Sequence, residues 1–187
     1  MDSSERPLFC TWSYRQSLPP AIRSKFRDLD HFVRTLCASA HQQLFLVAPY
    51  LSPAGLEALR SPIAASASRG AWIRLLTGDL DNAVGWNRKA LTTLVGGDEG
   101  YVIRKRLRVL TGTSLLPELI HAKMALSDST AGYLGSANFS QSAMERNFEL
   151  GIALDGTQVK SLASLFTFLE AQGFIHDCTD RVVGECN

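Results

Sequence analysis

The chain has 187 residues, of which 45% are hydrophobic and 20% charged, and its formal net charge at pH 7 is +1. This balance is ordinary for a globular protein and excludes disordered and fibrous classes. With so little net charge, any affinity for nucleic acid has to come from a local patch. We expect one domain over residues 1–187, because no internal repeat or low-complexity linker divides the sequence.

We also expect a cytoplasmic protein without stable membrane insertion. No stretch approaches the ~18 consecutive apolar residues of a membrane span. The start, MDSSERPLFCTW, does not combine a basic region with an apolar run, as a signal peptide would.

The first half alternates between predicted helices and predicted buried strands. Residues 1–19 are expected to be irregular. Apolar residues at steps of three and four then predict a helix over 20–40. The apolar runs 43–49 and 72–77 predict buried strands, and helices are expected over 53–67, with Pro62 as a candidate break, and over 81–94. This order predicts an α/β layer fold.

The second half is richer in predicted strands. They cover residues 102–110, 121–127, 131–134 and 148–154. A last helix is expected to begin near Thr157 and to end before Gly173, which suits the position after a helix C-terminus.

The chemically informative segment is 121–138, HAKMALSDSTAGYLGSAN. On a strand, His121 and Lys123 share one face, opposite Ala122 and Met124. Histidine can act as a nucleophile near neutral pH, and lysine can hold a phosphate oxygen. The following Gly-Ser-Ala-Asn could complete an oxyanion cradle. Taken alone, His-x-Lys more often marks a solvated strand face.

This segment resembles the phospholipase D superfamily, whose signature is H-x-K-x(4)-D-x(6)-G-S-x-N. His121, Lys123 and Asp128 match its first part, and Gly135, Ser136 and Asn138 match its second part. The resemblance implies a mixed, mostly parallel β-sheet flanked by helices on both faces. It also implies a phosphodiesterase that needs no metal and no cofactor.

The resemblance assigns a role to each matched residue. His121 would attack phosphorus and form a phosphohistidine, while Lys123, Asn138 and Ser136 would bind the non-bridging oxygens. Glu149, eleven residues after Asn138, would hydrogen-bond the His121 ring. Asp128 would be mainly structural, holding the turn after its strand.

The reaction needs a second histidine to protonate the leaving oxygen, and many family members carry the motif twice. Here His31, His41 and His176 have no Lys two residues later. We therefore expect a homodimer in which each subunit contributes His121. The alternative is a degenerate, inactive half-site.

The motif does not choose the substrate. If residues 102–110 form a strand, Arg104, Arg106 and Arg108 share one face and could follow a nucleic-acid backbone; the alternative is an ordinary charged strand face. This favours a nuclease for DNA or RNA. The alternatives are a lipid or small phosphodiester hydrolase and a non-catalytic nucleic-acid-binding subunit. For the lipid alternative, the apolar residues before His121 could touch a membrane, although core or dimer packing is favoured: Leu115, Leu116, Pro117 and Leu119.

The segments HAKMALSD, GSANFS and RNFELGI are also similar to single-motif phospholipase D-like proteins of bacterial anti-phage and restriction systems. That similarity implies a role in phage defence, with partner subunits for targeting.

Overall fold

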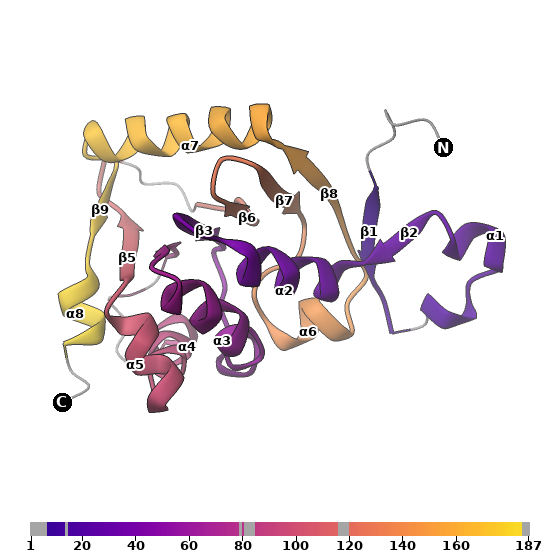
Figure 1. Ribbon diagram of the computed structural model, residues 1–187, viewed down its shortest axis with the longest axis horizontal. Coiled ribbons are helices and arrows are strands. Elements are labelled where there is room, and N and C mark those ends of the chain that lie inside the picture. The colour runs from indigo at the N-terminus through magenta and orange to yellow at the C-terminus, as the bar shows by residue number, and fades with distance from the viewer. Residues whose placement is uncertain (1–6, 14, 79, 81–84, 116–119, 185–187) are drawn as a thin grey trace.

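The computed structural model describes residues 7–13, 15–78, 80, 85–115 and 120–184. Within these ranges, nine strands form one sheet in the order β2-β1-β8-β7-β6-β3-β4-β5-β9 (Figure 1). The strands are β1 (Leu8–Thr11), β2 (Phe26–Asp28), β3 (Gln43–Val47), β4 (Trp72–Leu76), β5 (Leu107–Gly112), β6 (Met124–Ser127), β7 (Ala131–Gly135), β8 (Glu149–Asp155) and β9 (Ile175–Asp177).

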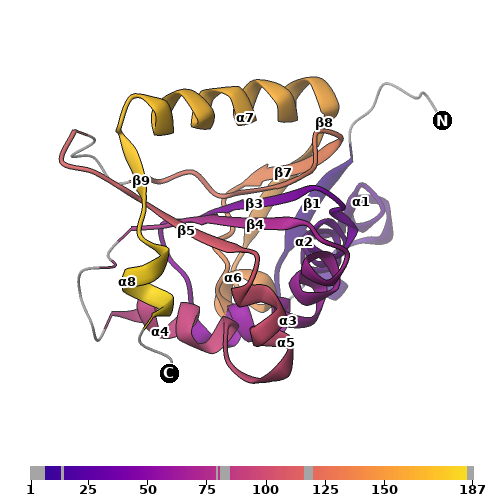
Figure 2. The ribbon, with the colours of Figure 1, turned by 60° about the vertical axis from the view of Figure 1, so that its left-hand side comes forward.

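Most of the helices connect these strands and lie in two layers. They are the 3-10 turn η1 (Arg15–Ser17) and the helices α1 (Pro20–Arg23), α2 (Leu29–Ser39), α3 (Pro53–Ser68), α4 (Trp86–Leu94), α5 (Gly97–Arg104), α6 (Gln141–Glu145), α7 (Gly156–Ala171) and α8 (Thr179–Val183). Figure 2 shows α7 alone on one side of the sheet, with α2 to α6 on the other side. The predicted α/β fold with helices on both faces is therefore confirmed.

The sheet is mixed, as predicted, but it is not mostly parallel. Parallel pairing joins β1 to β2, β3 to β4 and β4 to β5. The pairs β1–β8, β8–β7, β7–β6, β6–β3 and β5–β9 are antiparallel. Part of the reason is local: a three-residue turn joins β6 to β7, and only antiparallel strands can be joined so directly.

Each face of the sheet carries its own apolar core. On the central strand β3, Leu44 and Leu46 pack toward the helical layer, whereas Phe45 and Val47 pack toward α7. A strand that is buried on both faces has to be apolar at every buried position, which explains the continuous run at 44–47.

The predicted helix over 20–40 is wrong in its middle. It is divided into α1 and α2 by the short strand β2, which pairs with β1 inside the segment predicted to be irregular. Asp28 then begins α2 as its N-cap, because its side chain accepts the backbone N–H of His31 at 2.8 Å.

Pro62 does not break α3, which is continuous from Pro53 to Ser68. A proline inside a helix leaves the carbonyl of residue i−4 without its N–H partner. Here that carbonyl belongs to Ala58, and the Arg34 guanidinium on α2 donates to it. A contact between α2 and α3 thus satisfies the carbonyl that Pro62 leaves without a partner.

The strand predicted over 102–110 is also wrong. Residues up to Arg104 form α5, whose N-terminal Gly97 has a φ of +69° and whose Gly100 packs against the backbone of Val95. The strand begins only at Leu107, where it pairs in parallel with Ile73 of β4. The missed elements β9, α6 and α8 are all five residues or shorter.

The other elements agree closely with their predicted ranges. The helix predicted over 81–94 is seen as α4, while residues 81–84 lie outside the described part of the chain. Gly173 follows α7 with a φ of +74°, as expected after a helix C-terminus. Across the described ranges, none of the helices has the length and apolar character needed to cross a membrane.

Candidate active site

The segment His121 to Lys123 leaves the sheet just before β6. It was predicted to be part of that strand, but pairing begins at Met124, opposite Val47 of β3 and Leu134 of β7. Beyond this point the chains that continue β3 and β7 meet each other in a parallel bridge between Leu51 and Phe139. The segments that follow β3 and β7 thus come together where β6 is absent, and residues 121–123 are displaced from the sheet.

Lys123 is buried beside an exposed His121. Only 6% of Lys123 is accessible, and its Nζ lies 2.9 Å from Nδ1 and 3.1 Å from Nε2 of the His121 ring. The same Nζ donates to the His121 carbonyl at 2.8 Å. The predicted alternation holds for the neighbours, because Ala122 and Met124 pack into the core below α7. The structure therefore brings imidazole and ammonium together.

Burial lowers the pKa of Lys123, and the negative charge of Glu149 partly opposes this shift. A buried ammonium costs free energy unless anions compensate it. An incoming phosphodiester would supply the missing negative charge.

Ser136 and Glu149 form a hydrogen-bonded unit beside this pair. The Ser136 hydroxyl donates to Oε2 of Glu149 at 2.5 Å and accepts the backbone N–H of Leu150 at 3.1 Å. Asn147 donates its side-chain amide to Oε1 of the same carboxylate at 3.2 Å. Glu149 therefore binds Ser136 and Asn147, and its predicted hydrogen bond to the His121 ring is not made.

Two buried oxygens at the same end of the sheet have no hydrogen-bond partner within the described structure. They are Oδ1 of Asn138, in the loop after β7, and Oγ1 of Thr11, at the end of β1. Thr11 lies opposite Glu149 in the β1–β8 register. Unsatisfied buried polar atoms are uncommon in folded proteins, and a water molecule or a ligand can supply the missing partner.

Tyr133 supports the loop that carries Ser136 and Asn138. Its side chain is fully buried, and its hydroxyl accepts the backbone N–H of Ala137 at 3.1 Å. A Cβ on Gly135 would lie 2.3 Å from that hydroxyl, and one on Gly151 would lie 2.2 Å from the ring. The motif glycine is therefore required by the close approach of a tyrosine.

Asp128 lies at the opposite end of β6, where it has a structural role. Its φ is +53°, and its carboxylate accepts the backbone N–H groups of His41 at 3.1 Å, Gln42 at 2.7 Å and Gln43 at 2.9 Å. Burial alone would raise the pKa of Asp128, but these donors outweigh it and hold the pKa below its ordinary value.

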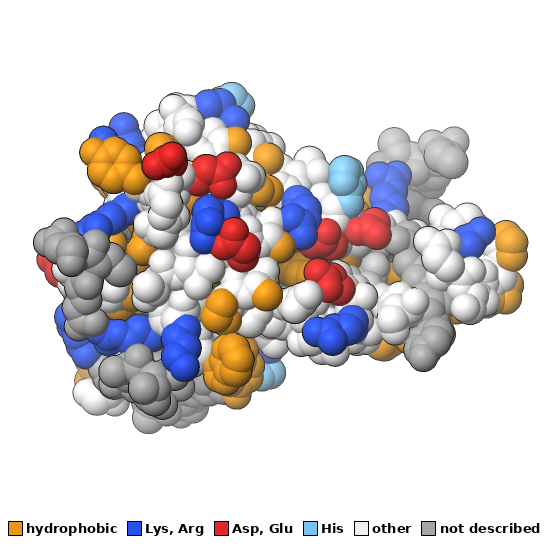
Figure 3. Space-filling view, turned by 90° about the horizontal axis from the view of Figure 1, so that it is seen from below, with side chains coloured by type: hydrophobic (Ala, Val, Ile, Leu, Met, Phe, Trp, Pro, Cys, Tyr) orange, Lys and Arg blue, Asp and Glu red, His pale blue; other side chains and the backbone are white. Residues whose placement is uncertain are grey.

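The three predicted arginines do not share a strand face. Arg104 ends α5, Arg106 lies in the following turn with its guanidinium 5.2 Å from the Trp72 ring, and only Arg108 is on β5. Arg108 pairs with Glu170 and Asp177, both at 2.8 Å. Figure 3 shows basic side chains gathered toward the end of the molecule that carries α5 and α8, and basic and acidic ones mixed elsewhere on this face. Their binding of nucleic acid stays a prediction.

Sequence reasoning missed Tyr133, Thr11 and Asn147. Only Tyr133 had a usable signal: it precedes Gly135 by two residues, so both lie on one face of the strand. Of the apolar residues before His121, Leu115 is exposed, whereas residues 116–119 lie outside the described ranges.

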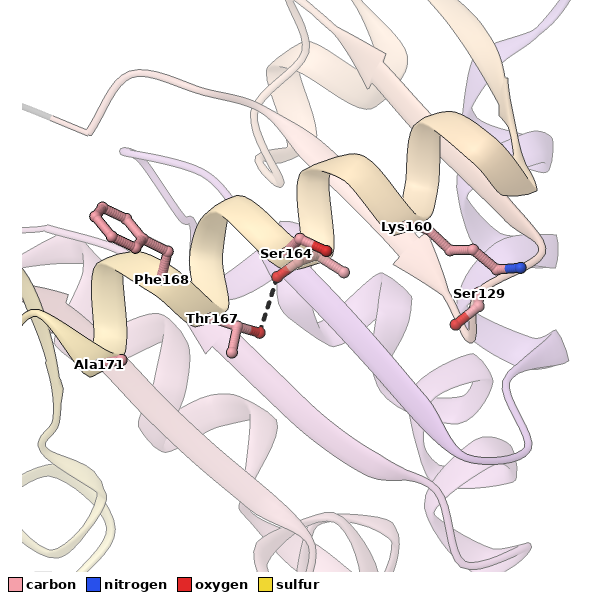
Figure 4. Close-up of a pocket in the computed structure, with 7 residues that line it drawn as sticks. Ser129, Lys160, Ser164, Thr167, Phe168 and Ala171 are labelled. Carbon is pink, nitrogen blue, oxygen red and sulfur yellow. Dashed lines mark hydrogen bonds between the residues drawn. The ribbon is translucent and has the colours of Figure 1, made fainter.

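A groove runs along α7 beside Ser129, which follows Asp128 at the end of β6 opposite Lys123 (Figure 4). Its volume is about 480 Å³, and Lys160 is the one charged residue that lines it. In the part of the chain that the structure describes, no group of three His, Cys, Asp or Glu side chains is placed to hold a metal ion.

A mixed sheet between two helical layers, with histidine, buried lysine, serine and asparagine at one end, defines an α/β protein of the phospholipase D type. The family model described as "Cardiolipin synthase, PLD-like domain" matches residues 33–167. The chain therefore belongs to the phospholipase D-like domain family, which confirms the resemblance seen in the sequence.

Solved structures with the same fold support this assignment. The phospholipase D family member Nuc from Salmonella typhimurium has a TM-score of 0.61 and 16% identity, over 92% of this chain and 98% of its own. NucT from Helicobacter pylori has a TM-score of 0.59 and 18% identity, over 87% and 93%. The archaeal chromatin protein TrmBL2, described as showing a novel mode of DNA binding, has a TM-score of 0.51 and 13% identity, over 89% and 53%. None of the curated proteins matches this chain.

Proposed function

We propose that this chain is a metal-independent phosphodiesterase in which His121 is the nucleophile. The observation that carries the proposal is the contact between the exposed His121 ring and the buried Lys123 Nζ, at 2.9 Å. The imidazole is accessible to a substrate, while the ammonium beside it is desolvated and fixed. Such a preorganised cation stabilises charge on a phosphoryl oxygen far better than a solvated one.

The reaction has two balanced steps. First, an imidazole nitrogen of His121 attacks phosphorus in line, so that a P–N bond forms and the bond to the leaving oxygen breaks. A second, protonated imidazole gives its proton to that oxygen. Water then attacks phosphorus, the P–N bond breaks, and the water proton passes to the second imidazole. The product is a phosphomonoester.

The neighbouring polar groups bind the oxygens that do not react. Lys123 and Asn138 hold the two non-bridging oxygens. Asn138 donates to one of them through its amide nitrogen, while its buried Oδ1 stays in place. Ser136 begins the same loop and positions it, because its hydroxyl donates to Glu149. Tyr133 holds this loop in place through Ala137.

The second imidazole comes from another copy of the chain. His41 follows α2 at the far end of β6, where its backbone contacts Asp128. His176 is on β9, at one edge of the sheet. His31 begins α2 beside β2, and β2 lies four strand positions from β6, or ~19 Å. A homodimer with His121 of both subunits in one site meets the requirement.

The substrate that we favour is DNA or RNA. Arg104 and Arg106 supply positive charge on the described surface, and the fold is shared with a DNA-binding protein. The similarity of the motif segments to defence-associated proteins supports a role in phage defence, with partner subunits that target the reaction.

The proposal is tested by cleavage assays in EDTA with single-stranded DNA, duplex DNA, RNA and phosphatidylcholine. Wild-type protein should cleave a nucleic acid, and His121→Ala should lose at least ~10⁴-fold in rate while it still binds the substrate. The matched control is His31→Ala, which removes an exposed imidazole far from the site. Acid quenching should trap an acid-labile phosphohistidine. Strict dependence on added magnesium would contradict the metal-independent mechanism. Cleavage of phosphatidylcholine alone would contradict the proposal that the substrate is a nucleic acid.

A further inference from the structure

Two large aromatic side chains are exposed at the end of the sheet that carries the candidate active site. Tyr50, in the segment after β3, is 55% exposed, and Trp86, the first residue of α4, is 70% exposed. A single exposed aromatic residue is ordinary on a protein surface. Two of them beside one site are a candidate surface for a planar ligand.

Tyr50 lies beside the motif residue Asn138. A parallel bridge joins the residues that follow them, Leu51 and Phe139. Tyr50 and Asn138 are therefore neighbours too, with their backbones ~4.8 Å apart. Leu51 and Phe139 both point into the main core. Successive side chains of an extended segment alternate between faces, so Tyr50 and Asn138 both point away from that core. Tyr50 thus shares its face with a residue that we assign to substrate binding.

Asn87 joins Trp86 to the same segment. The Asn87 side chain is buried, its amide nitrogen donates to the Pro49 carbonyl at 2.8 Å, and its Oδ1 accepts the Leu51 N–H at 2.7 Å. Pro49 and Leu51 are the two chain neighbours of Tyr50, and Trp86 directly precedes Asn87. One buried amide thus fixes the backbone on both sides of Tyr50 and beside Trp86. In α/β sheets the carboxyl ends of parallel strands, such as β3 and β4, are the usual place for a ligand.

The segment that carries Tyr50 is also tied to the motif loop. The Ser52 hydroxyl accepts the backbone N–H of Gly55 at 3.0 Å and that of Gln141 at 3.1 Å, and the Ser52 N–H donates to the Phe139 carbonyl at 3.2 Å. A Cβ on Gly55 would lie 2.4 Å from that carbonyl, so α3 and the motif loop approach each other closely. A ring on so well fixed a backbone loses little conformational entropy when a ligand binds.

The helix α4 adds positive charge beside Trp86. Lys89 is exposed and lies three residues after Trp86, so the two side chains are neighbours on one face of the helix. None of the residues of α4, Trp86–Leu94, is acidic. Aromatic rings next to a cation suit a nucleotide, because the base stacks on a ring while the phosphate meets the positive charge.

We propose that Tyr50 and Trp86 form a stacking platform for unpaired bases of the nucleic acid that is cleaved at His121. The inference rests on the proposed function, and it narrows the substrate to strands whose bases are free. Bases in a duplex stack on one another and offer no face to these rings. Stacking on an aromatic ring also tolerates every base, because every base has a π-face. The platform therefore predicts a preference for single strands over duplex, without a preference for sequence.

The first test measures binding in the His121→Ala background, where no cleavage is needed. Fluorescence anisotropy compares a single strand, its duplex and an abasic strand of the same length, each as DNA and as RNA. The single strand should bind at least ~10-fold more tightly than the abasic strand. Adding Tyr50→Ala or Trp86→Ala should weaken binding of the single strand alone by about 5- to 10-fold. Tyr50→Phe and Trp86→Phe should restore it, because a phenyl ring still stacks.

Two further readouts separate stacking from catalysis. Single strands should quench the tryptophan fluorescence of the starting protein, and Trp86→Phe should reduce this quenching although it still binds. With His121 present, the alanine variants should raise the KM for single strands and leave cleavage of the abasic strand unchanged. The matched controls are Tyr101→Ala on α5 and Phe168→Ala on α7, where the replaced rings are 59% and 56% exposed. Both should bind single strands like the starting protein.

The possible failures are distinguishable. Equal binding of the abasic and the base-containing strand, or alanine variants that bind as tightly as the starting protein, would overturn the platform and leave the nuclease proposal intact. Base-dependent binding by a wild-type protein that cleaves no nucleic acid would overturn the proposed function and support the platform. A lower mass of the alanine variants in light scattering would assign the two rings to contacts between subunits, and this would also overturn the platform.

Discussion

Residues of the motif lie at both ends of β6, and the two ends differ in how well their polar groups are satisfied. At one end, the Asp128 carboxylate accepts three consecutive backbone N–H groups. At the other end, Lys123 is buried with a lowered pKa, and the Asn138 Oδ1 nearby lacks a partner. A satisfied polar cluster stabilises the fold, whereas a buried ammonium of lowered pKa is stabilised by an anion that binds beside it. The motif thus combines a structural anchor with the proposed binding site on one short strand.

The largest effect is expected from replacing Lys123, which should lower activity without lowering stability. In Lys123→Met, cleavage should fall about 10²- to 10³-fold, because the fixed charge on the phosphoryl oxygen is lost. Burial lowers the pKa of Lys123, so the folded state disfavours the ammonium at neutral pH. The free energy of unfolding should therefore stay constant or rise. Kinetics with an activated phosphodiester and urea denaturation measure the two quantities.

The control for this variant is Lys160→Met on the exposed side of α7, which should change neither quantity. If Lys123→Met unfolded the protein instead, Lys123 would be a structural anchor like Asp128, and the contrast between the two ends of β6 would disappear.

Asp128 should show the opposite behaviour. In Asp128→Asn, the new amide side chain would tolerate the positive φ but would lack the charge, so the free energy of unfolding should fall by about 2 kcal/mol at pH 7. Because the pKa of Asp128 is lowered in the folded state, its contribution is present above its unfolded pKa of ~4 and is lost as the pH falls through the folded value. The difference between the two proteins should therefore shrink at pH 3.

Urea denaturation at both pH values measures this difference. Activity per folded molecule should be unchanged at pH 7. A variant of normal stability that no longer cleaves would instead place Asp128 in the chemistry.

A smaller effect is expected at Tyr133. In Tyr133→Phe, the buried Ala137 N–H loses its acceptor, which should cost about 1–2 kcal/mol and loosen the loop of Ser136 and Asn138. The rate should fall about tenfold at an unchanged KM, because the loop acts on bound substrate. Burial raises the pKa of Tyr133 to about 12, so this deficit should not vary between pH 6 and 9. The control is Tyr101→Phe, on the exposed helix α5. Equal losses of rate in the two variants would contradict the role of Tyr133 in holding the loop.

The grouping of the motif residues could be predicted because their spacing is a property of the chain. His121, Lys123, Ser136 and Asn138 come to one end of the sheet through a single hairpin. The contacts of Tyr133, Thr11 and Glu149 depend instead on the pairing of β1, β7 and β8, which local patterns do not determine. The same limit explains the misplaced strand at 102–110, where alternating residues suit either a strand or the end of α5.

That misplaced strand leads to the smallest expected effect, which concerns the arginines. Arg104 and Arg106 lie at and after the end of α5, whereas Arg108 is held by Glu170 and Asp177. If the first two contact phosphates, Arg104→Gln with Arg106→Gln should weaken nucleic-acid binding by less than about tenfold and lower the salt slope by at most ~2. Arg108→Gln should instead reduce stability, because Asp177 loses its arginine partner and Glu170 keeps only Arg74. Fluorescence anisotropy at several salt concentrations, with thermal unfolding of each variant, distinguishes these outcomes. An unchanged slope in the double variant would mean that the nucleic acid approaches from another face, as a site shared between two subunits would allow.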